Sequence, residues 1–164
     1  MRRVRISYFA SVPKVPCDIT VVSNGGYPLD QNIYQAVKGL TSAEATNKVG
    51  GVIIMLAGLA DGTGGKGFYN NMAQSKTPKE YLDRVSHVDR RHTVADQWES
   101  QVLARILNQH RVIMVSDLIQ PEIVTDMHME HAKTFDEALR RAYDIQGGTA
   151  KVSVTPDGLA VIGC

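Results

Sequence analysis

The side chains best suited to chemistry lie on a short stretch of predicted helix, residues 31–39. With the 3.6-residue period of a helix, one face presents the phenol of Tyr34, the amides of Gln31 and Gln35 and the ammonium group of Lys38. The opposite face is apolar and holds Ile33, Ala36, Val37 and Leu40. Ligands of α/β proteins collect where strands end and helices begin, which is where this stretch falls. The same pattern is also typical of a solvated amphipathic surface helix, and periodicity alone does not decide between the two.

The segment before this helix is predicted to be a buried strand followed by a glycine turn. Residues 18–22 are β-branched and apolar, as in a strand with both faces covered. Residues 25–28, Gly-Gly-Tyr-Pro, are typical of a turn. Asp30 is a suitable N-cap residue for the helix, and Gly39 stands where its C-terminus is expected.

The remaining pattern predicts an α/β fold with layers of helices around a mostly parallel sheet. A capping-box spacing at 41–44 predicts a second short helix through residue 48, and the apolar run 52–57 is typical of a strand covered on both faces. Two strands separated by helical sequence require a crossover connection, which favours parallel pairing. Further elements are predicted as helices at 77–88, 93–109 and 134–145, a strand at 111–116, and a C-terminal hairpin or last pair of strands at 151–154 and 159–162.

Trp98 is a second candidate for a site. It lies at the edge of the apolar arc of the helix predicted at 93–109, where Thr93 is a suitable cap. A tryptophan at such a boundary usually packs against a rim and keeps its N–H group in water. The pattern therefore leaves a packing role and a ligand-binding role open.

The loop 58–67 contains five glycines in ten residues. It fails the phosphate-binding P-loop pattern, because Ala60 stands where the first glycine is required and Gly67 follows Lys66 in place of serine or threonine. The loop either lends backbone N–H groups to an anion or is a plain flexible connection.

One run of residues is specific enough to indicate a family. Residues 23–30 read Ser-Asn-Gly-Gly-Tyr-Pro-Leu-Asp, and residues 34–39 read Tyr-Gln-Ala-Val-Lys-Gly. Further similar stretches are 50–55, 61–65, 68–69, 96–99, 112–116 and 155–158. Over about residues 17–164 the chain resembles the C-terminal domain of the nickel-pincer lactate racemase family, although family members often have histidine where Thr63 stands. The resemblance covers only the second domain of a two-domain enzyme.

The resemblance implies a reaction and a set of site residues. The family interconverts D- and L-lactate, or related 2-hydroxy acids, by passing a hydride between the substrate Cα and a nickel pincer nucleotide. The resemblance implies that Lys38 and Gln35 are catalytic residues that bind the substrate oxygens. It also implies that Tyr34 forms the pocket wall. Trp98 is implied as a lid residue that contacts the substrate and the cofactor ring.

The resemblance also implies a missing partner. The lysine that tethers the cofactor, the histidine that binds nickel and the acid–base histidines belong to the family's first domain, and their motifs are not present here. We therefore assign no metal-binding residue, expect no cofactor on this chain alone, and expect the isolated chain to be inactive. An N-terminal cofactor-binding domain, in cis or in trans, would complete the site.

Length and composition are ordinary for one soluble domain. The chain has 164 residues and a net charge of +1, which gives no reason to expect nucleic acid or an anionic membrane as a partner. No apolar run is long enough to span a bilayer. Two cysteines, Cys17 and Cys164, fit a reducing, cytoplasmic location. We expect an extended or poorly ordered segment at 1–16 that does not match the family, a single α/β domain at 17–164, and an exposed domain–domain face that is also available for homo-oligomerisation.

Two other classes of function are weighed against the racemase. The first is a truncated, inactive module of the same fold that binds small anions or a protein. The second, an NAD-dependent oxidoreductase, is disfavoured because no G-x-G-x-x-G pattern follows the first strand. His128 and His131 lack an H-E-x-x-H pattern and a third ligand, so we interpret them as structural or surface histidines and not as metal ligands.

Overall fold

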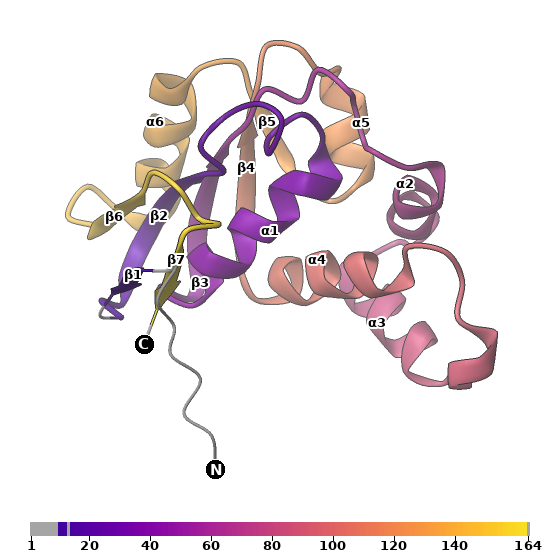
Figure 1. Ribbon diagram of the computed structural model, residues 1–164. Helices are drawn as coiled ribbons and strands as arrows, with labels where there is room; N and C mark the ends of the chain where they lie inside the picture. Colours follow the sequence, from indigo (N-terminus) through magenta and orange to yellow (C-terminus); the bar gives the residue numbers. More distant parts are fainter. Residues whose placement is uncertain (1–9, 13, 164) are drawn as a thin grey trace.

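The computed structural model describes residues 10–12 and 14–163. Its centre is a five-stranded sheet in the order β5-β4-β3-β2-β6, and every pair of neighbouring strands is parallel. Figure 1 shows this sheet between layers of helices. The prediction of an α/β fold with a mostly parallel sheet is therefore confirmed. The strands are β2 (Cys17–Ser23), β3 (Asn47–Leu56), β4 (Arg111–Val115), β5 (Glu130–Ala132) and β6 (Val152–Thr155).

The alternation of side chains along the strands divides the core in two. One core lies between the sheet and α6 (Phe135–Gln146), and its strand residues are Ile19, Val21, Val52, Ile54, Ile113 and Val115. The other core lies on the opposite face, where its strand residues are Val22, Ile53, Met55, Val112 and Met114. That face is covered by α1 (Ile33–Glu44), α2 (Lys66–Ala73), α3 (Pro78–Ser86), α4 (Gln97–Gln109) and α5 (Pro121–Asp126). Within the described residues, no helix combines the length and apolar character that crossing a membrane requires.

Helix α1 differs from its prediction at both ends. Its N-cap is Asn32, whose side chain accepts a hydrogen bond from the Gln35 N–H, and Asp30 instead accepts one from the Gly58 N–H. The helix continues through Gly39 to Glu44, so the second helix predicted from the capping-box spacing does not form. The absence of a Cβ at Gly39 serves packing, because an added Cβ would lie 2.1 Å from the amide oxygen of Asn24.

The later helices agree more closely with the sequence. Thr77 and Thr134 cap α3 and α6 by accepting hydrogen bonds from the backbone N–H groups of Glu80 and Glu137, respectively. Helix α4 begins later than predicted, since its N-cap is Asp96 and not Thr93. A short 3₁₀ helix, η1 (Arg90–His92), occupies part of the preceding connection.

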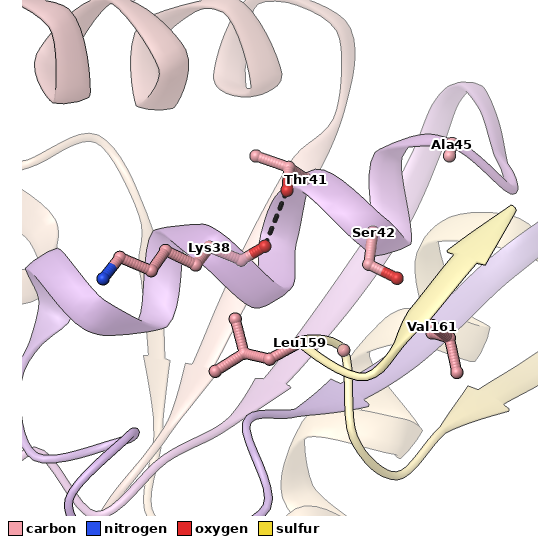
Figure 2. Close-up of a pocket in the computed structure, with 7 residues that line it drawn as sticks. Lys38, Thr41, Ser42, Ala45, Leu159 and Val161 are labelled. Carbon is pink, nitrogen blue, oxygen red and sulfur yellow. Dashed lines mark hydrogen bonds between the residues drawn. The ribbon is translucent and has the colours of Figure 1, made fainter. Parts of the chain in front are cut away.

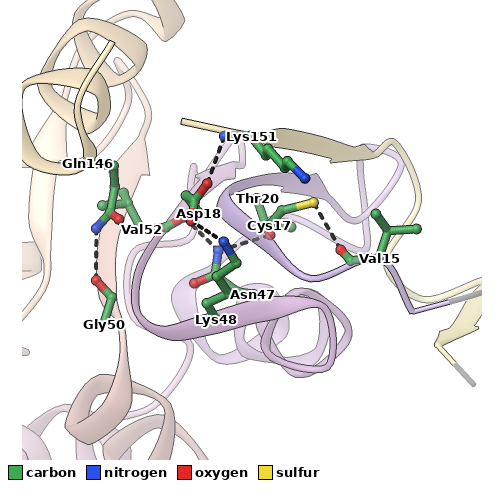
Figure 3. A network of polar contacts seen from close by, with 10 residues as sticks. All are labelled: Val15, Cys17, Asp18, Thr20, Asn47, Lys48, Gly50, Val52, Gln146 and Lys151. Atoms are coloured by element: carbon green, nitrogen blue, oxygen red, sulfur yellow. Dashed lines mark hydrogen bonds and ion pairs between the residues drawn. The ribbon is translucent and has the colours of Figure 1, made fainter. Parts of the chain in front are cut away.

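A buried polar network holds the amino ends of the strands together (Figure 3). The Asn47 amide donates to Thr20 Oγ1 at 3.0 Å and to the Val52 carbonyl at 3.1 Å. Its oxygen lies 3.1 Å from Nδ1 of His110 at the end of α4. These bonds join β2, β3 and α4 at the edge of the sheet opposite the carboxyl ends of the strands.

The C-terminal strands do not form a hairpin. Strand β6 pairs with β2 in the main sheet, whereas β7 (Val161–Gly163) pairs in parallel with β1 (Ala10–Val12) in a separate two-stranded sheet. The turn after β6 is held by a hydrogen bond from the Gly158 N–H to the Ser23 carbonyl at 2.7 Å. A Cβ at Gly158 would lie 3.0 Å from the Gly39 Cα, so the chain passes tightly over α1 and away from β6. Apart from Ala10–Val12 and residues 14–16, the predicted segment 1–16 lies outside the described residues.

Candidate functional site

The three candidate residues of α1 lie just after the carboxyl end of β2. Ile33, Ala36, Val37 and Leu40 are fully buried on the other side of the helix, which turns Tyr34, Gln35 and Lys38 outward. Lys38 is exposed, and its ammonium group donates a hydrogen bond to Gln35 Oε1 at 2.6 Å. Gln35 therefore orients the only cation on this part of α1, and the amide N–H₂ group of Gln35 remains available as a donor.

Trp98 joins this face from a different helix. Its ring meets the Tyr34 ring edge-to-face, with centroids 5.9 Å apart and an interplanar angle of 88°. Tyr34 makes a similar contact with Phe68 of α2, at 5.4 Å and 76°. Phe68 is fully buried and Trp98 is 57% exposed, so the three rings lead from the core to the surface. The structure thus brings together all four residues that the sequence singled out, on the adjoining surfaces of α1 and α4.

The phenol of Tyr34 stays protonated on this face. Burial raises the pKa of Tyr34, and the nearby carboxyl groups of Glu99 and Asp96 raise it further. A neutral phenol donates a hydrogen bond through its O–H group and accepts through its oxygen.

Glu99 is a residue of this site that sequence reasoning missed. It follows Trp98 on α4, is 1% exposed, and its Oε1 has no hydrogen-bond partner. Burial raises the pKa of this carboxyl group to about 7, the positive charge of Lys38 lowers it, and Asp96 raises it. A signal was present in the sequence, because with a helical period Glu99 falls in the middle of the apolar arc of α4.

The glycine-rich loop supports both helices of the site. The carbonyls of Gly62 and Thr63 accept hydrogen bonds from the Ile33 and Tyr34 N–H groups at 3.0 and 3.2 Å, which satisfies two donors of the first turn of α1. A Cβ on Gly67 would lie 3.0 Å from an Asp96 carboxylate oxygen, so the loop also packs closely against the start of α4. The loop is therefore more than a plain connection, while the alternative anion-binding role stays a prediction.

A pocket of about 360 Å³ runs along the other end of α1 (Figure 2). It is lined by Lys38, Thr41, Ser42, Ala45, Gly158, Leu159 and Val161. In Figure 2 the Lys38 ammonium extends along the helix, away from Val161 and Ser42. Lys38 therefore borders this pocket as well as lying on the outward face of α1.

The two histidines interpreted as structural have backbone partners. Nε2 of His128 lies 3.2 Å from the Met72 carbonyl, and Nε2 of His131 lies 2.8 Å from the Ser116 carbonyl. Among residues 10–12 and 14–163, no group of three or more His, Cys, Asp or Glu side chains is placed to hold a metal ion.

Comparison with known proteins shows the family of this chain. Residues 12–163 match the model of the lactate racemase C-terminal domain. The chain belongs to this family. It is 59% identical to the lactate racemase of Lactiplantibacillus plantarum and 51% identical to that of Thermoanaerobacterium thermosaccharolyticum, over 157 residues in each case. The solved structure of the T. thermosaccharolyticum lactate racemase apoprotein superposes with a TM-score of 0.92 over 94% of this chain.

The chain spans only part of the length of the lactate racemases that it matches. Each alignment covers 96% of this chain but only 37% of the curated lactate racemase. The chain therefore corresponds to the C-terminal part of lactate racemase. An alignment of 157 residues also begins before Cys17, so the expectation that residues 1–16 do not match the family is wrong.

Proposed function

We propose that this chain is the half of a 2-hydroxy acid racemase that closes over the substrate and binds its oxygens. The observation that carries the proposal is the joint face of Tyr34, Gln35, Lys38 and Trp98 in a chain that corresponds to the C-terminal part of lactate racemase. One cation, one amide and one neutral phenol converge there, beside an exposed aromatic ring.

These groups match the chemistry of a 2-hydroxy acid. The substrate has a carboxylate, and its hydroxyl oxygen gains negative charge as the hydride leaves Cα. A lysine ammonium group stabilises such charge strongly in a site that excludes water. Lys38 binds the substrate oxygens, and Gln35, already hydrogen-bonded to Lys38 at 2.6 Å, holds that ammonium and donates to the same oxygens.

The two aromatic residues shape the site. Tyr34 is held between Phe68 and Trp98, so its phenol forms a fixed wall with an O–H donor. Trp98 projects beyond this wall and covers the substrate and the cofactor ring when the site closes. Both residues exclude water, which strengthens the interaction of Lys38 with the substrate.

The remaining chemistry belongs to another polypeptide segment. The nickel pincer nucleotide implied by the family would supply hydride acceptance and return, and the acid–base groups would come from the N-terminal cofactor-binding domain. This chain contributes binding, orientation and exclusion of water. By itself it is inactive, and the domain that completes it acts in cis or in trans.

Reconstitution tests the proposal. The purified chain is mixed with the cofactor-loaded N-terminal part of the L. plantarum lactate racemase, and conversion of L-lactate to D-lactate is followed with a stereospecific D-lactate assay. We expect racemisation only in the mixture, and loss of it with Lys38→Ala but not with Lys76→Ala, a change at an exposed lysine between α2 and α3.

A binding measurement separates failed assembly from failed function. Trp98 is the only tryptophan, so its emission reports directly on this face. Docking of the other domain is expected to shift the emission to shorter wavelength, because an exposed indole becomes buried. A blue shift without racemisation would refute the proposed reaction and favour an inactive binding module.

A further inference from the structure

Asp96 is the residue at which α4 begins, and its backbone lies in the left-handed region. Its φ is 60° and its ψ is 11°, and only two other described residues that are not glycine, Leu59 and His128, have a positive φ. Aspartate and asparagine tolerate this region better than most residues, but it still costs conformational energy. Residues in such conformations persist where the surrounding structure fixes them, and they cluster at functional sites. Asp96 is two residues before Trp98, so its conformation bears on the candidate site.

The two polar groups of Asp96 serve two different helices. Its carbonyl oxygen accepts hydrogen bonds from the Ser100 N–H at 3.1 Å and from the Ser100 hydroxyl at 2.9 Å, in the first turn of α4. Its carboxylate makes no capping hydrogen bond to α4. The carboxylate lies instead against the start of α2, where a Cβ on Gly65 would be 3.2 Å from Oδ2 and a Cβ on Gly67 would be 3.0 Å from it.

This contact explains why the glycine-rich loop has no side chain at 65 and 67. Neither glycine has a positive φ, so what requires glycine at these positions is the space that the Asp96 carboxylate occupies. A negative charge is also favourable there. Gly65 is the N-cap of α2, the first turn of α2 holds no acidic residue, and the N-terminus of a helix carries a partial positive charge.

Helices α2 and α4 carry the two rings that hold Tyr34. Phe68 follows Gly67 directly, and Trp98 follows Asp96 by two residues. Both rings meet the Tyr34 ring edge-to-face, with centroids 5.4 Å away for Phe68 and 5.9 Å away for Trp98. The Asp96 carboxylate therefore joins the two chain segments that place these rings. Because Trp98 is 57% exposed, its position depends on where α4 begins.

We propose that Asp96 is a positioning residue of the substrate site. Its carboxylate, held against Gly65 and Gly67, sets the start of α4 and so places Trp98 against Tyr34. The inference rests on the proposed function, because Trp98 is the residue that covers the substrate there. It also gives the glycine-rich loop a part in the site, as the surface against which Asp96 packs.

The position of Trp98 is measured first, on the chain itself and without any activity. Nuclear Overhauser effects (NOEs) between the indole protons of Trp98 and the ring protons of Tyr34 are recorded by NMR in the wild type, Asp96→Gly and Asp96→Asn. Glycine keeps the left-handed backbone but removes the carboxylate, so these NOEs are expected to be lost. Asparagine keeps both the shape and the backbone and is expected to retain them, as is the control Asp117→Gly at an exposed position after β4. Wild-type NOEs in Asp96→Gly would overturn the proposal.

A second variant reaches the same contact from α2 and leaves Asp96 in place. Gly67→Ala puts a methyl group 3.0 Å from Oδ2, so the carboxylate has to move and the NOEs between Trp98 and Tyr34 are expected to weaken. Gly148→Ala, where a Cβ meets open space, is the matched control and is expected to leave them unchanged. Unchanged NOEs in Gly67→Ala refute the positioning role even where Asp96→Gly fails to fold.

Turnover of the reconstituted two-domain enzyme then separates the two proposals. Asp96→Gly is expected to lower kcat/KM at least roughly tenfold, because a group displaced by about 1 Å loses much of its effect, and Asp96→Asn is expected to restore most of it. Wild-type kcat/KM in Asp96→Gly overturns the positioning role even when Lys38→Ala abolishes turnover. Full turnover in Lys38→Ala overturns the proposed function, and the substrate role of Asp96 with it, even when the NOEs respond as expected.

Discussion

Replacing Glu99 with glutamine isolates the free energy that this buried carboxyl group costs the folded chain. Burial raises the pKa of Glu99 from 4.5 to about 7. Each pKa unit corresponds to about 1.4 kcal/mol, so ionised Glu99 lowers the free energy of unfolding by about 3 kcal/mol. The folded chain binds the proton more tightly than the unfolded chain. The contribution of Glu99 to stability is therefore fully present below pH 4.5 and is lost as the pH rises through 7.

Urea unfolding of the wild type and Glu99→Gln between pH 4.5 and 8 measures this contribution. Glutamine does not titrate, so the difference in unfolding free energy between the two chains is expected to change by about 3 kcal/mol across the range, in favour of Glu99→Gln at high pH. Other titrating groups contribute equally to both chains and cancel. Glu122→Gln is expected to run parallel to the wild type. If Glu99→Gln also runs parallel, the carboxyl group is not desolvated and the reasoning about its burial fails.

Three further predictions test other parts of the structure. In the two-domain enzyme, Lys38→Ala is expected to lower kcat on the order of 10²-fold, and a near-wild-type rate would remove Lys38 from the site. Gly39→Ala is expected to destabilise the chain by about 1–3 kcal/mol in urea unfolding, because its Cβ would lie 2.1 Å from Asn24 Oδ1. Gly148→Ala, where a Cβ meets open space, is the matched control and is expected to change stability by less than about 0.5 kcal/mol. Burial lowers the pKa of His110, so protonation favours the unfolded chain. Stability is then expected to fall as the pH drops below the unfolded value of 6.5, and His110→Gln to show a smaller fall over that range.

The polar face of α1 was predictable because it depends on local periodicity. Tyr34 and Lys38 share a face in any helix that buries Ile33 and Val37, whatever the helix packs against. The caps of α3 and α6 were predictable for a similar reason, since Thr77 and Thr134 bond within one turn of their own positions.

The errors concern residues whose partners are distant in sequence. The spacing at 41–44 has the form of a capping box, but packing of α1 on the sheet carries the helix through Gly39 to Glu44. Gly39 lacks a side chain because Asn24 and Gly158 approach it, and neither contact is visible from its neighbours in the chain. The two C-terminal strands form as predicted, but the hairpin alternative is wrong because β6 and β7 each pair with a strand far away in sequence, β2 and β1, respectively.

The sequence alone therefore determined the parallel α/β fold, the family and the outward face of Tyr34, Gln35 and Lys38. Only the tertiary structure decided that the ring of Trp98 contacts the ring of Tyr34 and that the side chain of Glu99 is buried. The physical reason is that the face of a helix on which a side chain lies is set by the residues within one or two turns of it. Desolvation and charge compensation, in contrast, depend on which elements pack together.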